Sequence, residues 1–224
     1  MKQAIDSEKI LILDFGSQYT QLIARRIREQ GVYSEILSCN TPYKNILKAN
    51  PKGIIISGGP ESVNAKSTLQ VDSKILDSDI PILGICYGMQ LMAKHFKGSV
   101  NTSKKREFGH AEIKLNKSKL LQGVKTSKLN VWMSHGDKVI KLPKGFKKIS
   151  SSKNSPIAAF ENNSIRKYGL QFHPEVTHTE KGAQILKTFV RDICSCQTKW
   201  RSKNIVDKLA VSYTHLTLPT KRIV

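Results

Sequence analysis

The residue best suited to covalent chemistry in this chain of 224 amino acids is Cys86. It lies between a short apolar run, Ile82–Ile85, and a segment with helical spacing that begins at Met89. At such a strand-to-helix turn, the helix dipole and free amide groups favour the reactive thiolate. A cysteine with apolar neighbours is more often simply a small buried hydrophobe. Gly84 and Gly88 favour the reactive interpretation, because they let backbone segments come close to the turn.

A histidine and a glutamate farther along the chain could complete a site of this kind. His173 and Glu175 are separated by Pro174, and in an extended chain residues two apart face the same way. A carboxylate beside an imidazole fixes its tautomer and stabilises its charged form. The two residues could therefore serve a nucleophile, although a surface His–Glu pair is the plainer alternative.

A glycine-rich loop follows another buried apolar run, residues 53–57. Gly58 and Gly59 could cradle a phosphate, but neither a following Gly-Lys-Ser/Thr nor a dinucleotide glycine spacing is present. They could instead expose backbone N–H groups to a developing oxyanion, or form a plain Gly-Pro turn. Functional loops meet at the carboxyl ends of parallel strands, so a position beside Cys86 favours the oxyanion interpretation.

A further polar segment, Met-Ser-His-Gly-Asp, occupies residues 133–137. It follows an apolar stretch and contains a glycine, which predicts a turn that presents backbone groups to a ligand. Taken alone, His135 is better interpreted as structural than as catalytic.

Strand and helix patterns alternate over the first half of the chain. Apolar runs predict buried parallel strands at residues 10–13, 34–37, 53–57 and 82–85. Helical spacing predicts helices at residues 19–30, 43–49, 69–76 and 89–93. The alternation predicts an α/β fold, with a mostly parallel open sheet flanked by helices.

Beyond Phe96 the pattern changes to short alternating segments. Residues 111–115 and 130–133 are predicted to be antiparallel strands that extend one edge of the sheet. Residues 156–160 and 164–168 are predicted to pair as a hairpin joined at Asn162-Asn163. Apolar residues between 180 and 194 have helical spacing and predict a helix that packs back on the sheet.

The charge balance raises nucleic-acid binding as a function class. The chain has 37 Lys and Arg against 17 Asp and Glu, a net charge of +20, but 29 of these cations are lysines and only 8 are arginines. Specific phosphate and base recognition favours arginine forks and stacking aromatics, which are not interleaved here. We therefore expect a solvated lysine-rich surface rather than a nucleic-acid site, with an acidic partner domain or an anionic substrate as remaining options.

Cysteine usage and hydropathy indicate the compartment. The four cysteines, Cys39, Cys86, Cys194 and Cys196, form neither a disulfide framework nor a zinc spacing, so a reducing cytoplasm and no metal are expected. No apolar stretch approaches the roughly 20 residues of a membrane span, and the N-terminus lacks a signal-peptide core.

Taken together, the motifs resemble the class I (Cys-His-Glu) glutamine amidotransferases. The match is closer still to the amidotransferase domains of GMP synthetases and covers roughly residues 9–209. The resemblance rests on Asp-Phe-Gly-Ser-Gln at 14–18, Ser-Gly-Gly-Pro at 57–60, Gly-Ile-Cys-Tyr-Gly at 84–88, Met-Ser-His-Gly-Asp at 133–137, Phe-His-Pro-Glu at 172–175 and Phe-Val-Arg-Asp-Ile-Cys at 189–194. The combination is specific, whereas a single motif would not be.

The resemblance implies a role for each matching position. Cys86 is expected to attack the side-chain amide of glutamine, with His173 as general base and later acid and Glu175 orienting the imidazole. Backbone N–H groups of Gly59 and Tyr87 are expected to form the oxyanion hole. A γ-glutamyl thioester, then glutamate and ammonia, would be the products, and this step would need no cofactor.

A glutamine-binding set follows from the same resemblance. Its members are expected to be Gly58, Gln90, Ser134, His135, Gly136 and Asp137.

The resemblance also implies a partner and a domain boundary. In the bifunctional enzymes an ATP-pyrophosphatase domain, which uses ATP and Mg, follows the amidotransferase domain and converts XMP to GMP. We therefore assign residues 1–198 to an amidotransferase domain and 199–210 to a connector toward the missing domain. Residues 211–224 resemble no part of the family and are interpreted as translated sequencing-adapter sequence.

Two alternatives remain beside this interpretation. The chain could be an amidotransferase domain of another pathway or a γ-glutamyl hydrolase, although the segments at 14–18 and 134–137 argue against both. It could also be a non-catalytic basic binding domain, against which the intact Cys86, His173 and Glu175 argue.

Overall fold

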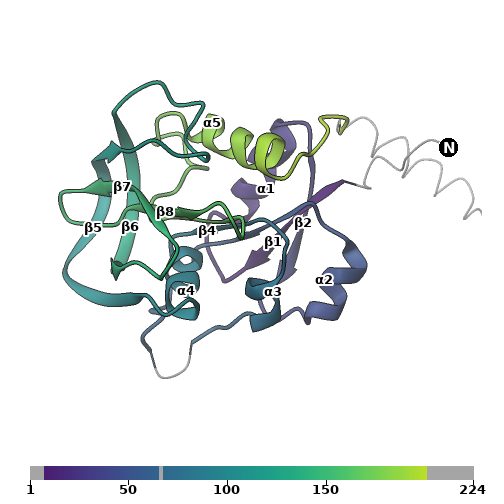
Figure 1. Cartoon of the computed structure of the whole chain (residues 1–224), viewed down its shortest axis with the longest axis horizontal. Coiled ribbons are helices and arrows are strands. Elements are labelled where there is room, and N and C mark those ends of the chain that lie inside the picture. Colours follow the sequence, from purple (N-terminus) through teal and green to yellow (C-terminus); the bar gives the residue numbers. More distant parts are fainter. Residues whose placement is uncertain (1–7, 66–67, 201–224) are drawn as a thin grey trace, which may run out of the picture.

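A computed structural model describes residues 8–65 and 68–200 of the chain (Figure 1). Its elements, in chain order, are β1 (Lys9–Asp14), α1 (Thr20–Glu29), β2 (Tyr33–Ser38), α2 (Tyr43–Ala49), β3 (Gly53–Ile56), α3 (Ser73–Asp77), β4 (Ile82–Ile85), α4 (Tyr87–His95), β5 (Ser99–Leu115), β6 (Lys128–Lys141), β7 (Lys147–Ser152), β8 (Ala159–Asn162), β9 (Lys167–Leu170), α5 (Gly182–Lys187) and the π-helical turn η1 (Thr188–Ile193). The connector expected at 199–210 and the tail at 211–224 lie beyond residue 200, except for the first two connector residues.

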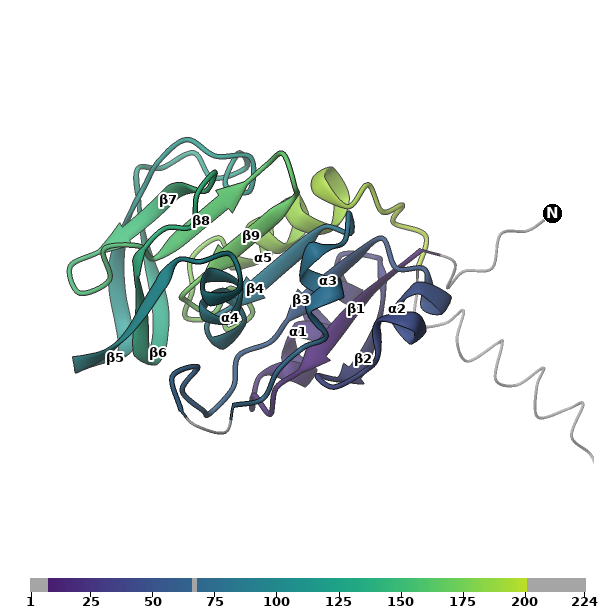
Figure 2. The same cartoon turned by 60° about the horizontal axis from the view of Figure 1, so that its bottom comes forward.

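The strands form one sheet of nine, in the order β2-β1-β3-β4-β9-β8-β7-β5-β6. Strands β2, β1, β3, β4 and β9 run parallel, and the remaining neighbours pair antiparallel. Figure 2 shows the sheet running from β2 at one end to β5 and β6 at the other. The predicted α/β class, with antiparallel strands added at one edge, is confirmed.

Helices cover both faces of the parallel half of the sheet. Figure 1 shows α1 and α5 on one face and α2, α3 and α4 on the other. The side chains of β1 divide between two hydrophobic cores, with Ile10 and Ile12 in the first and Leu11 and Leu13 in the second, and all four are fully buried. A parallel strand covered on both faces needs apolar side chains throughout, which accounts for the continuous run in the sequence.

The last strand, β9, enters the sheet beside β4. Ile85 of β4 is in register with Leu170 of β9, although the two residues are far apart in the sequence. The residue after β4 is Cys86, and His173 lies three residues after Leu170. Strand pairing therefore brings the predicted nucleophile and the predicted base to the same edge of the sheet.

The turn expected at residues 133–137 is wrong, because this segment lies inside β6. Met133, His135, Asp137 and Val139 are buried at alternate positions, which is the period of a strand. Ser, Gly and Asp suggested a loop, but two of the inward positions, His135 and Asp137, carry buried polar side chains, while Met133 and Val139 on either side belong to the hydrophobic cores.

Two predicted helices differ from the structure in extent. The helix expected at 69–76 begins only at Ser73, because Asp72 caps it by accepting a hydrogen bond from the Lys74 N–H, while the carbonyl of Leu69 accepts one from the Tyr87 hydroxyl. The helix expected at 180–194 is divided into α5 and the π-helical turn η1. Within residues 8–65 and 68–200, no helix is both long enough and apolar enough to cross a membrane.

The hairpin expected at Asn162-Asn163 is present, with later strand boundaries. Strands β8 and β9 pair antiparallel from Ala159 opposite Leu170 to Asn162 opposite Lys167. The side chain of Asn162 accepts hydrogen bonds from the N–H groups of Ser164 and Ile165 and so forms the turn itself.

Candidate active site

Cys86 occupies a strained turn between β4 and α4. Its backbone angles are φ 51° and ψ −103°, a conformation that is costly for any residue other than glycine. A 2.7 Å hydrogen bond from its N–H to the carbonyl of Leu170 ties the turn to β9. The residue is 5% exposed, so it is almost completely buried.

Two glycines allow this turn to pack tightly. A Cβ added to Gly84 would lie 2.5 Å from the carbonyl carbon of Gly88, and one added to Gly88 would lie 2.5 Å from the carbonyl oxygen of Ile56. No real Cβ tolerates such a distance, so both glycines are required for α4 to lie this close to β3 and β4. The N-terminus of α4, with its free N–H groups, is thereby held beside Cys86.

His173 and Glu175 form a buried pair just beyond β9. The His173 Nδ1 and Glu175 Oε1 atoms are 2.7 Å apart, and the two residues are 3% and 1% exposed. Burial by itself would lower the pKa of His173, but hydrogen bonds to Cys86 and Glu175 outweigh burial and raise this pKa to about 10. The imidazole is therefore held in its charged form at neutral pH.

The chain around this pair consists of bends and turns rather than the expected extended segment. Two hydrogen bonds fix the backbone of His173 instead. Its N–H donates to the carbonyl of Trp132 at 3.1 Å, and the carbonyl of His173 accepts from the Thr179 hydroxyl at 2.6 Å. The Arg26 guanidinium on α1 donates to the carbonyl of Glu175 at 2.9 Å. These contacts orient the imidazole toward Cys86 without a regular strand.

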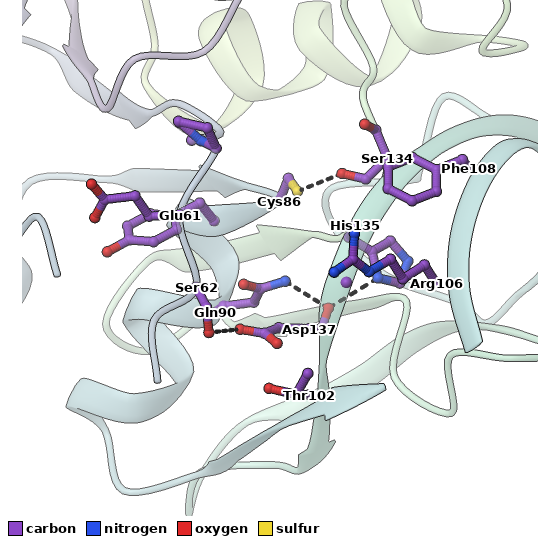
Figure 3. Close-up of a pocket in the computed structure, with 14 residues that line it drawn as sticks. Glu61, Ser62, Cys86, Gln90, Thr102, Arg106, Phe108, Ser134, His135 and Asp137 are labelled. Atoms are coloured by element: carbon purple, nitrogen blue, oxygen red, sulfur yellow. Dashed lines mark hydrogen bonds between the residues drawn. The ribbon is translucent and has the colours of Figure 1, made fainter. Parts of the chain in front are cut away.

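Two cavities meet at Cys86. The first, of about 300 Å³, is shown in Figure 3, and its lining includes Gly59, Glu61, Cys86, Tyr87, Gln90, Arg106, Ser134, His135, Gly136 and Asp137. The second, of about 310 Å³, is lined by Gly16, Ser17, Gln18, Tyr19, Gly59, Pro60, Cys86, Ser134 and His173. Cys86 thus has the charged first cavity on one side and the imidazole of His173 on the other.

Strand β6 supplies one wall of the first cavity. The carbonyl of Ser134 lies 3.5 Å from the Cys86 sulfur. The carbonyl of Asp137 accepts hydrogen bonds from the Gln90 amide nitrogen at 2.8 Å and from His135 Nδ1 at 2.9 Å, and its carboxylate accepts one from Ser62 (Figure 3). The wall is therefore held to α4 and to the loop after β3.

The two residues expected to form the oxyanion hole lie beside Cys86. Gly59 and Tyr87 line the first cavity beside Cys86. Tyr87 begins α4, and burial raises the pKa of its hydroxyl to about 12. Gly58 lines neither cavity and lies behind His173, since a Cβ added there would be 3.3 Å from the His173 Cε1 atom.

No metal site accompanies these groups in the part of the chain that the structure describes. Residues 8–65 and 68–200 contain no group of three or more His, Cys, Asp or Glu side chains placed to hold a metal ion.

Comparison with known proteins identifies the family. Residues 11–193 match the family model described as glutamine amidotransferase class-I. The chain belongs to the class-I glutamine amidotransferase family. Among curated amidotransferase relatives, it is 48% identical over 208 residues to "GMP synthase [glutamine-hydrolyzing]" of Vibrio vulnificus, covering 92% of this chain and 40% of the relative.

A relative from a second organism carries the same description. The protein of the same description from Neisseria meningitidis is 53% identical over 204 residues, covering 90% of this chain and 39% of the relative. The chain thus spans about two fifths of the length of these curated relatives.

Solved amidotransferase structures share the fold. A Thermoplasma acidophilum protein, described as one of the subunits of a GMP synthase, superposes with a TM-score of 0.75 at 32% identity, covering 89% of this chain and 97% of that one. A glutamine amidotransferase of Thermotoga maritima has a TM-score of 0.62 at 20% identity, covering 91% and 85% of the two chains, and supports the fold alone.

Sequence reasoning missed one polar cluster of this amidotransferase site. Glu107 on β5 faces His135 Nε2 at 3.2 Å, and its carboxylate accepts hydrogen bonds from Ser152 and Ser155 at 3.0 and 2.8 Å. Burial would raise the pKa of Glu107, but these hydrogen bonds lower it. His135 therefore lines the first cavity while its ring nitrogens face the Asp137 carbonyl and the Glu107 carboxylate, so it ties β6 to β5.

Gln171 was also missed. It is fully buried directly after β9, and its side-chain nitrogen lies 3.7 Å from the Cys86 sulfur. Its position two residues before His173 was the only available signal, because nothing in the sequence indicates which side of the sheet its side chain meets.

Proposed function

We propose that this chain hydrolyses the side-chain amide of glutamine to glutamate and ammonia. The observation that supports the proposal most strongly is the convergence of Cys86 with the buried His173–Glu175 pair beside a cavity that carries both acidic and basic side chains. A nucleophile, a base, an orienting carboxylate and paired amides are the parts that acyl transfer needs.

The first half of the reaction forms a thioester. The Cys86 thiolate attacks the side-chain carbonyl carbon of glutamine, and the negative oxygen faces the N–H groups of Gly59 and Tyr87. His173 gives its proton to the amide nitrogen, the carbon–nitrogen bond breaks and ammonia leaves. Glu175 holds the imidazole and its positive charge in place.

The second half regenerates the enzyme. His173 takes a proton from water, whose oxygen attacks the thioester carbonyl. The carbon–sulfur bond breaks, glutamate is released and Cys86 returns to the thiolate. All the groups that these two steps need belong to this chain, so the glutaminase step requires no cofactor.

Substrate recognition is proposed for the first cavity. Gln90 and the β6 wall, Ser134 to Asp137, lie on its sides. Gly58, expected in the same set, lies instead against His173 and Cys86. Glu61 and Arg106 bring opposite charges to the same cavity, which suits an amino acid with both an ammonium and a carboxylate.

The ammonia is proposed to serve the amination of XMP to GMP by an ATP-pyrophosphatase partner domain, in the same chain or in trans, in the cytoplasm. ATP and Mg would be needed only there. The support is the similarity to proteins described as glutamine-hydrolysing GMP synthases, of which this chain spans about two fifths. A glutaminase of another pathway or a γ-glutamyl hydrolase is the second candidate, and a non-catalytic basic binding domain is the third.

A glutaminase assay on the purified chain tests the proposal. Wild type is expected to release glutamate, and Cys86→Ala is expected to release none, because it lacks the sulfur that forms the thioester. His173→Ala should be nearly as inactive, and Glu175→Ala should keep more activity, because the carboxylate only orients the ring. Glutamate release by Cys86→Ala, or full activity in His173→Ala, would contradict the assignment.

A further inference from the structure

The buried amide of Gln171 contacts the sulfur at which the proposed reaction occurs. Gln171 is 0% exposed, and its Nε2 atom lies 3.7 Å from the Cys86 sulfur, within hydrogen-bonding range for sulfur. It lines neither of the two cavities that meet at Cys86. Its amide therefore faces the nucleophile rather than the space available to a substrate.

A chain of hydrogen bonds determines which end of this amide meets the sulfur. The backbone carbonyl of Asp137 can only accept, and it lies 2.8 Å from the Gln90 side-chain nitrogen. That nitrogen also lies 3.3 Å from the Gln171 side-chain oxygen, which must accept the second hydrogen bond. The Gln171 nitrogen is then the atom left to face Cys86, and it can only donate.

The sulfur consequently has two neighbours of opposite kind. The carbonyl of Ser134, at 3.5 Å, can accept the proton of a neutral thiol but repels a thiolate. The Gln171 N–H can donate a hydrogen bond to the thiolate, but it cannot accept one from the proton of a neutral thiol. When that proton moves to His173, the sulfur loses its hydrogen bond to Ser134 and keeps the one from Gln171.

We infer that Gln171 is a further catalytic residue, whose amide N–H stabilises the Cys86 thiolate through a direct hydrogen bond. This role rests on the proposed glutamine hydrolysis and adds Gln171 to the residues that carry out that reaction. The amide stabilises the charged sulfur before attack and again when the carbon–sulfur bond of the thioester breaks and the thiolate leaves. It transfers no proton, so His173 remains the acid and base.

Alkylation of Cys86 by iodoacetamide tests this role without glutamine. The thiolate displaces iodide, a sulfur–carbon bond forms, and the modified Cys86 peptide is counted by mass spectrometry, which separates it from the buried Cys39, Cys194 and Cys196. The rate is measured in wild type and Gln171→Met from about pH 5 to about pH 10, a range that spans ordinary imidazole and thiol titration. Methionine matches the length of glutamine but has no N–H to donate.

The midpoint of the alkylation profile is expected to move to higher pH in Gln171→Met, and the rate at neutral pH to fall about tenfold or more, as expected for the loss of a hydrogen bond to a charged acceptor. Gln171→Glu, which places a carboxylate there, is expected to move the midpoint further. In a glutaminase assay kcat should fall by a similar factor with little change in KM. Gln122→Met, a change on the exposed side of the domain, is the matched control and should leave the profile unchanged.

An unchanged alkylation profile in a folded Gln171→Met protein would overturn the inference. Gln171→Asn provides a second variant, because it retains a buried amide but is too short to reach the sulfur. If Gln171→Met does not fold, a wild-type profile in folded Gln171→Asn overturns the inference equally, and a shifted profile supports it. If wild type hydrolyses no glutamine but its profile depends on Gln171, the proposed function fails while the contact with the thiolate stands.

Discussion

At the scale of single residues, the site is held in conformations that cost free energy. Cys86 is the clearest case, because its φ of 51° and ψ of −103° lie outside the regions that a residue with a Cβ adopts readily. This backbone conformation places the sulfur at the edge of the sheet, between α4, β6 and β9. Stability and chemistry are therefore opposed at this position.

Replacement of Cys86 is expected to reveal this strain. Cys86→Gly should unfold at a higher urea concentration than Cys86→Ala, because relief of strain worth about 1–3 kcal/mol exceeds the roughly 0.5–1 kcal/mol by which glycine is entropically less favourable than alanine. Neither variant should hydrolyse glutamine, so activity is the shared control. Equal or reversed stabilities would show that the turn is unstrained.

The charged state of His173 predicts a pH dependence of stability. Its pKa is raised to about 10 in the fold from an ordinary value of 6.5, so proton binding by this ring stabilises the folded state. That stabilisation is complete below pH 6.5 and is lost as pH rises through about 10. The free energy of unfolding of wild type, relative to His173→Gln, should therefore decrease across this interval.

Urea titrations of both proteins at a series of pH values measure this difference. Cys86→Ala provides the control, because it removes one of the two hydrogen bonds that raise the His173 pKa. In that background the loss of stability should still begin near pH 6.5, but it should be smaller and should be complete at a lower pH. Parallel pH profiles for wild type and His173→Gln would contradict the assigned charge state.

At the scale of elements, the close approach of α4 to β3 and β4 positions Cys86. The approach requires the absence of side chains at Gly84 and Gly88. Alanine is otherwise the better helix former, by about 1 kcal/mol relative to glycine. At Gly88 the gain in helix propensity from alanine competes with the clash of its methyl group. The distance of 2.5 Å to the Ile56 carbonyl oxygen predicts that the clash is the larger effect.

Gly88→Ala is expected to destabilise the protein. The new methyl group would lie 2.5 Å from the Ile56 carbonyl oxygen, and such overpacking costs about 1–3 kcal/mol or more, which outweighs the gain in helix propensity. Glutaminase activity should fall as well, because Cys86 moves with α4. Thermal unfolding and the glutaminase assay measure both effects, with Lys48→Ala at an exposed position of α2 as control.

A Gly88→Ala protein as stable as wild type would mean that α4 can shift without cost. In that case the activity would show whether the shift also preserves the position of Cys86.

At the scale of the whole molecule, the positive charge bears on the proposed partner. The chain carries a net charge of +20 and spans about two fifths of its curated relatives. A lysine-rich surface can accelerate and orient association with an acidic partner. Coupling of glutamine hydrolysis to the proposed ATP-pyrophosphatase domain would also save glutamine, because ammonia released in the absence of that domain is not used.

We therefore expect weak glutaminase activity from the isolated chain and stimulation by an ATP-pyrophosphatase partner loaded with ATP and XMP. If only about a tenth of the isolated molecules hold the competent arrangement, a partner that selects it raises turnover about tenfold. The assay compares the chain alone, with the partner, and with the partner and both nucleotides. Cys86→Ala is the background control.

Stimulation that depends on XMP would identify the pathway. High activity that no partner changes would favour a stand-alone glutamine or γ-glutamyl hydrolase. Raised salt should weaken the stimulation if surface charge contributes to docking.

The sequence by itself determined most of the local elements and singled out the candidate nucleophile. Continuous apolar runs predicted strands buried on both faces. Gly84 and Gly88 marked a tight strand-to-helix turn around Cys86, because close backbone packing there leaves no room for side chains. These signals are local, since they depend on periodicity and backbone conformation over a few residues. The α/β class followed from them.

Only the tertiary structure decided which distant residues meet the sulfur. The pairing of β9 with β4 brings His173 and Gln171 to Cys86, and the register of β5 on β6 brings Glu107 to His135. Strand order and register depend on the packing of the whole sheet, which no local pattern encodes. For the same reason, the polar stretch of β6 looked like a turn in the sequence and proved to be the strand that forms the cavity wall.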